Sequence, residues 1–338
     1  MKKYTYVLLT LLCFFGLTGC GTDAGESGSA KDAEGTGNTE NKTVDAGDVL
    51  ADSDKGQNVP ATAGQNSGEE ERNGTGGGSG PEEREGTDLT GGETIQRLRI
   101  VDGAESGDLV LAGENAGQVY TLSLNGAAEI PVFLDGQSAQ ADALEDGMMV
   151  EVSFDGTVLE SYPAQFGEVY SLSGYSLGTA QNPGGSYYDL SGLYLQVLDD
   201  LWNRDPGLNS NISYVSVDLS EAPGGLTAGE REAIAWIFGC AHQAESLSLT
   251  LEELAEQGYL KEALPGSEHK LYEWEDGVLF RIDSSGGEEE GLYSLPVLKF
   301  DARKWRSPRG AYFFGDCRAV WPEFGTWSGY EIGDEAIS

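Results

Sequence analysis

The chain has 338 residues, with 57 acidic and 20 basic side chains and a formal net charge of −37. So acidic a surface repels nucleic acid and anionic lipid head groups, which argues against DNA, RNA or peripheral membrane binding by the folded part. The length leaves room for two domains, although a large part of the chain lacks the composition of a folded domain.

The first twenty residues have the organisation of an export signal. Lys2 and Lys3 form a short positive segment, and residues 6–17 form an apolar run that is too short to cross a bilayer comfortably. Leu-Thr-Gly-Cys at residues 17–20 then places small residues directly before Cys20. This order of segments predicts export from the cytoplasm.

The motif at residues 17–20 resembles the lipobox of bacterial lipoproteins. The resemblance implies that residues 1–19 are a cleaved signal peptide and that the Cys20 thiol carries the lipid. An ordinary secretory signal and an uncleaved membrane anchor are the alternatives, and each also places the rest of the chain outside the cytoplasm. We therefore expect a protein anchored by lipid to the extracytoplasmic face of the cell membrane.

Residues 20–94 are rich in Gly, Ser, Thr, Asn, Asp and Glu and contain few apolar side chains. Such a segment cannot bury enough apolar area to offset its conformational entropy, so we predict a disordered tether. A flexible chain of this length has a root-mean-square span of roughly 50 Å. It would hold the folded part away from the membrane, as in lipoproteins of Gram-positive bacteria. The alternative is a linker whose length serves no particular function.

Short runs of alternating apolar residues, separated by Gly, Asn and Asp, occupy residues 95–175. Asp155 and Gly156 lie between two such runs, which is typical of a hairpin. Short strands with a helical turn near residues 139–144 predict a small β-barrel. The expected strands are residues 95–101, 109–112, 119–124, 130–134, 148–154 and 157–162.

Three motifs end this segment: Asp-Gly-Met-Met-Val-Glu-Val at residues 146–152, Asp-Gly at residues 155–156, and Glu-Ser-Tyr-Pro-Ala-Gln at residues 160–165. They resemble the closing hairpin of small OB-like β-barrel domains in secreted and lipid-anchored bacterial proteins of unknown function. Together with the lipobox, the resemblance implies a surface lipoprotein of Gram-positive type that carries such a barrel. It implies a fold and no activity.

The barrel segment contains no Lys or Arg between Arg99 and Arg204. Oligonucleotide binding by OB-like barrels needs phosphate neutralisation, so we expect no nucleic acid partner. Asp102, Glu105 and Asp108 share a glycine-containing loop that offers oxygen ligands to calcium, but EF-hand spacing is lacking and a solvated acidic loop is the favoured alternative. We predict neither a metal site nor a cofactor.

Residues 187–338 predict an α+β domain, after a connection at residues 174–186 that is rich in Gly. An apolar stripe over residues 190–201 predicts a helix, and Thr-x-x-Glu capping boxes at Thr227 and Thr250 predict two more. Helices followed by an antiparallel meander make an α+β fold with the helices packed on the sheet. The expected strands are residues 212–219, 271–274, 278–282, 295–301 and 310–320.

Cys240 and Cys317 are the cysteines of the predicted folded part. The helical pattern places Cys240 on an apolar face, and alternation places Phe313 and Cys317 on one face of a strand. Outside the cytosol such a pair is a candidate disulfide. In a host without an exported oxidant the same residues would be two buried thiols.

The sequence names no catalytic residue. Cys240 and His242 lie two positions apart on a helix and point to different faces, so they cannot form a Cys–His pair, and His269 is the only other histidine. Neither a nucleophile elbow nor a metalloprotease motif is present. Because acidic residues are abundant, any two carboxylates that the fold places about 5–10 Å apart remain candidates for glycoside cleavage.

Basic residues gather around Trp305 and Tyr312. On an acidic protein, such a segment either pairs with the protein's own carboxylates or binds an anion or glycan. We expect residues 303–309 to form a loop that is salt-bridged to nearby carboxylates or to the barrel. The alternative is a site for an anionic wall polymer, a peptide carboxylate or another protein, formed by Lys299, Arg303, Lys304, Arg306 and Arg309.

These features predict a lipid-anchored cell-surface protein that acts as a non-catalytic binding or sensory module, with a cell-wall polymer or an extracellular protein as partner. The alternatives are an extracellular carboxylate-dependent hydrolase of wall or carbohydrate substrate, and a structural spacer. An enzyme should have converging acids with shifted pKa values in a concave site, whereas a binding module should have an exposed basic or aromatic patch.

We expect Cys20→Ala to move the protein out of the membrane fraction or to leave it unprocessed, because the acylated thiol would be missing. Metabolic labelling with a fatty acid, followed by fractionation, measures this. Unchanged lipid labelling of the variant would contradict the anchor.

Overall fold

The computed structural model describes residues 92–126, 129–176, 178–180, 189–267, 270–286, 289–290, 296–320, 327 and 329–338. These residues belong to one compact unit. The predicted signal peptide, Cys20, nearly all of the tether and His269 lie outside the described residues. No helix in the described ranges is long and apolar enough to cross a membrane.

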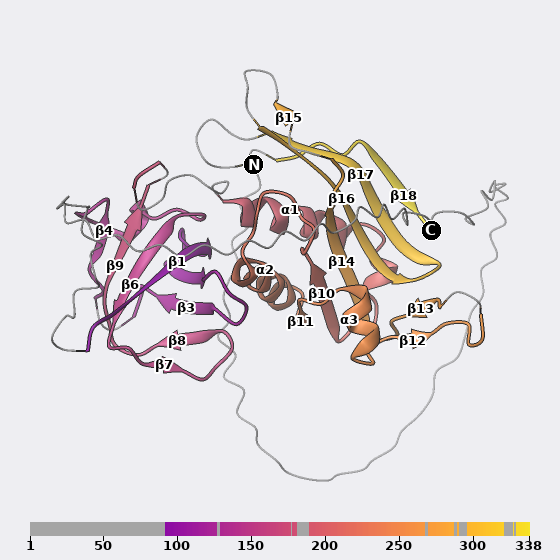
Figure 1. Cartoon of the computed structure of the whole chain (residues 1–338), viewed down its shortest axis with the longest axis horizontal. Helices are drawn as coiled ribbons and strands as arrows, with labels where there is room; N and C mark the ends of the chain where they lie inside the picture. The colour runs from indigo at the N-terminus through magenta and orange to yellow at the C-terminus, as the bar shows by residue number, and fades with distance from the viewer. Residues whose placement is uncertain are drawn as a thin grey trace, which may run out of the picture. The chain divides into compact units, whose positions relative to one another are not determined.

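The first strands of the chain form a nine-stranded mixed sheet in the order β5-β4-β9-β6-β1-β2-β3-β8-β7 (Figure 1). Each strand predicted from alternation has a counterpart in this sheet, and the predicted helical turn is the short helix η1 (Ala141–Ala143). The strands are β1 (Thr94–Asp102), β2 (Asp108–Ala112), β3 (Val119–Ser123), β4 (Val132–Leu134), β5 (Gln137–Ala139), β6 (Met149–Phe154), β7 (Val158–Leu159), β8 (Ala164–Phe166) and β9 (Val169–Tyr175).

This sheet is open, because β5 and β7 end the strand order and no pairing between described strands joins them. Closing a barrel requires hydrogen-bonded pairing all the way round. The sheet nevertheless curls: Val132 of β4 and Phe166 of β8 belong to the same hydrophobic cluster, although their strands are far apart in the order. The described strands therefore do not confirm a closed barrel.

The hairpin predicted at Asp155 and Gly156 is wrong. Asp155 accepts a hydrogen bond from the Thr157 amide (2.9 Å), and Gly156 has φ of 83°, so a turn does form. Beyond the turn, however, β7 pairs with β8, while β6 pairs with β1 and β9. The residues of the turn reverse the chain locally, but they do not select the strand with which the next segment pairs.

Strands β1, β2 and β3 are buried on both faces. Because successive side chains of a strand point to opposite faces, one set lines the interior of the curled sheet and the other set faces outward. The outward set packs in one cluster with the helices that follow. The inward set includes Leu98, Ile100, Leu109, Leu111 and Leu122, and the outward set is Val101, Val110, Ala112 and Val119.

The three predicted helices are confirmed as α1 (Leu190–Asn203), α2 (Ala228–Ala241) and α3 (Leu251–Glu256). Both predicted capping boxes are formed: Thr227 caps α2 and Thr250 caps α3, and the amide of each threonine donates to the carboxylate of the glutamate three residues later. The apolar stripe of α1 is buried, as its spacing predicts.

A second sheet has the strand order β11-β10-β14-β16-β17-β18, with β15 beside β16. The predicted antiparallel meander holds for β14 to β18, but β10 is parallel to both β11 and β14. The fold is thus α+β and mostly sheet. The elements are β10 (Tyr214–Asp218), β11 (Glu245–Leu247), β12 (Lys261–Glu262), β13 (Tyr272–Glu273), β14 (Gly277–Ser284), β15 (Glu289–Glu290), β16 (Pro296–Ser307), β17 (Gly310–Val320), β18 (Asp334–Ile337) and the short helix η2 (Pro206–Asn209).

Helices α1 and α2 contact strands of both sheets. Helix α2 contacts β1, β2 and β3 as well as β10 and β11, and α1 contacts β1 as well as β16 and β17. One hydrophobic cluster therefore runs from the outward face of β1–β3 through the helices to the second sheet. The two folded segments expected from the sequence share a core.

Polar contacts join the start of α2 to the turn between β2 and β3. The Thr227 hydroxyl donates to the Gly113 carbonyl (2.8 Å), and the Gly117 amide donates to the Glu232 carboxylate (2.6 Å). Gly229 lies so close that a methyl group there would be 2.5 Å from the Gly113 oxygen. No side chain larger than hydrogen fits at this position without displacing backbone.

We expect Gly229→Ala to lower the free energy of unfolding by about 1–2 kcal/mol. Alanine normally stabilises a helix by up to about 1 kcal/mol relative to glycine, but here overpacking against backbone outweighs that gain. Urea titration of residues 21–338 measures the change. In Gly126→Ala, the matched control, the added methyl would meet no atom closer than 3.9 Å. Equal stability of the two variants would contradict the close approach.

Candidate functional site

The candidate site lies where the parallel strands of the second sheet end. Helix α2 connects β10 to β11 and packs on one face of the sheet, in the cluster that contains Val215. Helix α3 follows β11 and packs on the other face, in the cluster that contains Tyr214, before the chain returns to β14. In open sheets, ligands bind beyond the carboxyl ends of the strands at such a reversal of connections.

Asp218 is the last residue of β10, and its side chain is almost fully buried. One carboxylate oxygen, Oδ1, accepts hydrogen bonds from the Ser220 amide (3.1 Å) and hydroxyl (2.7 Å). The other oxygen, Oδ2, accepts no hydrogen bond from a described residue and lies 3.4 Å from Nε of Arg281. A buried carboxylate is thus held at the carboxyl end of the central parallel strand.

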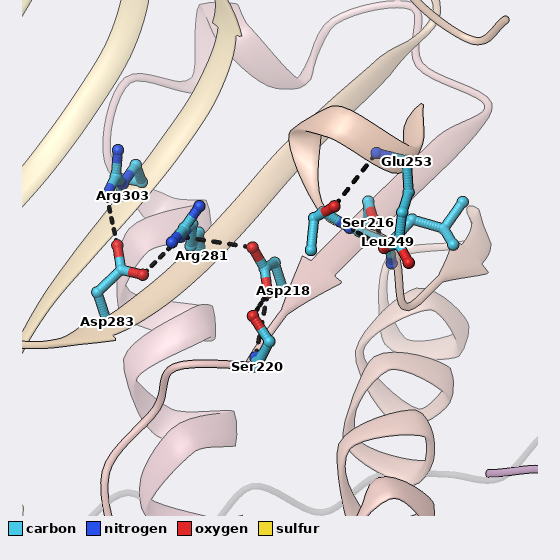
Figure 2. A network of polar contacts seen from close by, with 9 residues as sticks. Ser216, Asp218, Ser220, Leu249, Glu253, Arg281, Asp283 and Arg303 are labelled. Atoms are coloured by element: carbon cyan, nitrogen blue, oxygen red, sulfur yellow. Dashed lines mark hydrogen bonds and ion pairs between the residues drawn. The ribbon is translucent and has the colours of Figure 1, made fainter. Parts of the chain in front are cut away.

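Two arginines share one carboxylate beside Asp218. Arg281 of β14 and Arg303 of β16 are directly opposite in the strand register. Nε of Arg281 contacts Oδ1 of Asp283 (2.5 Å), and Nη2 of Arg303 contacts Oδ2 of the same side chain. Figure 2 shows these residues in a row with Asp218 across β16, β14 and β10. We call Asp218, Arg281, Asp283 and Arg303 the polar network.

The network leaves guanidinium donors toward solvent. Among the described residues, its contacts use only Nε of Arg281 and one Nη of Arg303, whereas a guanidinium has several N–H donors in a fixed plane. The side chains of Arg281 and Arg303 are 26 % and 43 % exposed. The remaining N–H groups are therefore accessible to water or to a ligand.

A second set of contacts orders the segment between β11 and α3, which borders the network. The Ser216 hydroxyl of β10 donates to the Leu249 carbonyl (2.7 Å) and accepts from the Leu249 amide (3.1 Å). Thr250 then caps α3, because its hydroxyl accepts a hydrogen bond from the Glu253 amide (3.2 Å); Glu253 is labelled in Figure 2. One hydroxyl and one capping box therefore hold this turn against β10.

The basic residues predicted to act together are divided by the structure. The expected loop over residues 303–309 is wrong, because β16 continues to Ser307. Since successive residues of a strand alternate in direction, Arg303 and Lys304 point to opposite faces. Arg303 lies in the polar network, Lys299 is half-buried on β16, and Arg309 is exposed in the turn between β16 and β17.

Lys304 is fully buried and caps the end of α1. Its Nζ donates to the carbonyls of Trp202 (3.1 Å), Arg204 (2.7 Å) and Asp205 (3.2 Å), and the Leu201 carbonyl lies 3.5 Å away. The last carbonyls of a helix have no partners within the helix, so an ammonium group satisfies several of them at once. Burial lowers the pKa of Lys304 to about 8.

Arg306 also binds main-chain oxygens. Its guanidinium donates to the carbonyls of Trp274 (3.2 Å), Leu208 (3.1 Å), Ser210 (2.7 Å) and Glu275. Lys304 and Arg306 therefore have internal partners, but these are carbonyls rather than the predicted carboxylates. Of the five basic residues predicted to form an anion site, only Arg303 belongs to the polar network. The sequence pattern around Arg281 predicts a strand but does not indicate a binding role for this residue.

Both described cysteines are free, so the predicted disulfide is not formed in this structure. Cys240 is exposed, and its predicted place on the buried face of the helix is wrong. Cys317 is fully buried in the core, on the face of Phe314 rather than Phe313, because a bulge in β17 shifts the alternation. Burial first, and neighbouring carboxylates next, raise the pKa of Cys317 to about 12.

His242 lies at the end of α2 among aromatic rings. It stacks on Trp202 with 3.8 Å between the ring centroids, and its Nε2 is 3.4 Å from Oδ1 of Asp199. Although the Cys240 residue is exposed, partial desolvation of its thiol raises the pKa, which opposes formation of a nucleophilic thiolate. The structure thus gives His242 a packing role between α1 and α2.

Three aspartates meet at the start of α1. Burial, and next the charge of Asp146, raise the pKa of Asp102 to about 6 and that of Asp189 to about 8. Burial likewise raises the pKa of Asp146. A methyl group on Gly147 would lie 2.1 Å from the Asp189 nitrogen, which shows how closely the two segments approach.

The calcium loop considered in the sequence is not assembled. Asp102 faces Asp146, whereas Asp108 accepts a hydrogen bond from the Ser123 hydroxyl (2.6 Å). Within the ranges that the structure describes, no group of three or more His, Cys, Asp or Glu side chains is arranged to hold a metal ion. The three aspartates are instead a cluster of like charges between the curled sheet and α1.

No protein-family model, curated protein or solved structure matches this chain. The geometry therefore carries the functional argument alone. It defines a mostly-β α+β protein with a polar network at the carboxyl end of its parallel strands.

We expect the free energy of unfolding to fall as the pH rises from about 5 to about 7.5. Aspartates whose pKa is raised above the ordinary 3.8 bind more protons in the folded state than in the unfolded state, so their stabilising effect is lost with rising pH. Asp189→Asn, which keeps a helix-capping side chain, should reduce this fall. Urea titrations at both pH values measure it, with exposed Asp142→Asn as control. An identical pH dependence in Asp189→Asn and the parent would contradict the raised pKa.

We expect Lys304→Met to destabilise the protein by about 3 kcal/mol, because several buried carbonyls lose a charged donor. Arg309→Met removes an exposed cation from the same hairpin and should change stability by less than about 0.5 kcal/mol. Thermal and urea unfolding measure both variants. Similar small effects would mean that Lys304 does not cap α1.

Proposed function

We propose that the protein is a lipid-anchored, extracytoplasmic binding module without catalytic activity, and that Arg281 and Arg303 are its ligand contacts. The observation that carries this proposal is the shared Asp283 carboxylate, which orients two directly opposed guanidinium groups while leaving their other donors accessible. The motif at residues 17–20 supports the anchor, and the composition of residues 20–94 supports a tether.

The chemistry of the network favours an anionic group as ligand. Guanidinium groups bind carboxylate and phosphate in a planar, two-pronged geometry. Because Asp283 already holds both arginines, less side-chain freedom is lost on binding. The ligand class is therefore a carboxylate or phosphate group of a cell-wall polymer or of an extracellular protein.

Electrostatics limits the expected affinity. The network contains two arginines and two aspartates, so its formal charges cancel, and the whole chain carries −37. Long-range attraction does not bring an anion to such a surface, and binding depends on direct hydrogen bonds. We expect weak monovalent binding, strengthened when a polymer presents repeated groups.

We infer in addition that the curled sheet is OB-like. Its strands enclose one hydrophobic cluster although the strand order is open, and an OB barrel is itself only partly closed. This inference concerns the fold of residues 95–175 and adds no activity.

A carboxylate-dependent hydrolase is the second candidate function. The observation that favours it is the convergence of Asp102, Asp146 and Asp189 with raised pKa values, since a general acid must be protonated near neutral pH. Release of reducing sugar from wall glycan, lost in Asp189→Asn but not in Arg303→Gln, would establish this function instead.

Isothermal titration of residues 21–338 with poly(glycerol phosphate), polyglutamate and inorganic phosphate tests the proposed site. Arg281→Gln and Arg303→Gln should each weaken polymer binding about 10- to 150-fold, the equivalent of about 1.5–3 kcal/mol for a charge-assisted hydrogen bond. Arg309→Gln, an exposed arginine outside the network, is the matched control. Equal loss in all three variants would indicate non-specific charge attraction and refute the site.

A further inference from the structure

Arg303 shares its face of the second sheet with an aromatic side chain, Phe313. In the register between β16 and β17, Phe313 is the direct partner of Arg303. Directly opposite residues of antiparallel strands project to the same side, with Cβ atoms about 4.5–5.5 Å apart. Tyr312, the neighbour of Phe313 in the chain, points to the other side and packs against the core that contains the helices. The aromatic residue beside the polar network is therefore Phe313.

Phe313 is half-buried but is not part of a hydrophobic core. It belongs to none of the three hydrophobic clusters that the described residues form. Its partner on the other side, in β18, is Ala336, whose side chain is too small to cover a phenyl ring. Ligand sites combine aromatic side chains of this kind with a few polar groups that fix the orientation of the ligand. We therefore expect the ring of Phe313 to be accessible to a ligand that binds Arg303.

The cross-strand neighbours of Arg303 carry carboxylates in one direction along the strands and no charge in the other. Two positions before Arg303 in β16, Asp301 is opposite Asp283 of β14. Two positions after Arg303, Trp305 is opposite Ala311 of β17. Because like charges repel at short range, an anion that binds Arg303 is favoured to extend toward Trp305 and β17 rather than toward Asp301.

The spacing of the two contacts suits one sugar ring. The guanidinium of Arg303 contacts Asp283 on the β14 side (Figure 2), whereas Phe313 lies on the β17 side. Neighbouring strands are about 4.8 Å apart, which is about the width of a sugar ring. A carboxylate carried directly on the ring can therefore pair with Arg303 while the flat apolar face of the ring packs on Phe313.

We propose that the ligand of the polar network is a polymer of acidic sugars, whose ring carboxylate pairs with Arg281 and Arg303 and whose ring stacks on Phe313. This inference rests on the function proposed above and specifies its ligand. Stacking does not depend on net charge, so it adds affinity on a chain of net charge −37, where long-range attraction does not. A polyol phosphate and an acidic peptide also pair with arginines, but they offer Phe313 no flat apolar ring.

Isothermal titration of residues 21–338 with polygalacturonate, polyglutamate and poly(glycerol phosphate) tests the choice of ligand. Polygalacturonate should bind about tenfold more tightly than the other two polymers, and Phe313→Leu should remove most of this difference without changing the affinity for polyglutamate. Phe313→Tyr keeps a ring and should bind like the parent. Ile337→Leu is the matched control, because Ile337 is an exposed apolar residue opposite Tyr312 and so lies on the other face of the sheet.

Proton NMR of trigalacturonate with the unmodified chain gives a readout that does not depend on affinity. The sugar-ring protons should shift upfield on binding, because they lie over the ring of Phe313, and Phe313→Leu should abolish this shift. Polymer binding that Arg303→Gln leaves unchanged, or no binding of any polymer, would refute the polar network as a site and this inference with it. Equal binding of polygalacturonate and polyglutamate, weakened by Arg303→Gln but not by Phe313→Leu, would overturn the sugar ligand alone. Tightest binding of poly(glycerol phosphate) would also overturn it and identify a phosphate polymer as the ligand.

Discussion

The packing of α1 and α2 against strands of both sheets is the constraint on which the rest of the structure depends. Strands β1–β3 have apolar residues on both faces, and without the helices their outward face would be exposed. The hydrogen bonds at Gly113 and the close approach of Gly229 fix where α2 begins against that face. The curled sheet and the helices therefore stabilise one another, because they share one hydrophobic cluster.

This packing determines how the charged residues are used. Lys304 and Arg306 donate to carbonyls at the end of α1 and in nearby turns, so most of the basic segment that resembles an anion site in the sequence has internal partners. The same packing brings Asp102, Asp146 and Asp189 together at the start of α1, where burial, and next the charge of Asp146, raise the pKa values of Asp102 and Asp189 and so favour proton binding. We therefore expect the contact between the curled sheet and α1 to weaken as the pH rises.

The polar network differs in chemistry from the acidic chain around it. It has guanidinium groups at the carboxyl ends of the parallel strands β10 and β14, where Arg303 of the antiparallel strand β16 lies opposite Arg281. On a chain of net charge −37, long-range attraction does not bring an anion to this network, so any anion would have to be held by direct hydrogen bonds.

The sequence by itself determined the local elements: both capping boxes, the apolar stripe of α1 and nearly all of the strands that alternate in polarity, because these depend on neighbours within a few residues. Only the tertiary structure decided which strands pair, that β7 turns away from β6, and that Cys240 faces solvent. It also decided that Arg281 meets Arg303, since a periodic pattern shows which residues share a face of one element but not which element lies opposite. Which elements lie opposite each other depends on the apolar area that the whole core buries, and residues distant in the chain contribute to that area together.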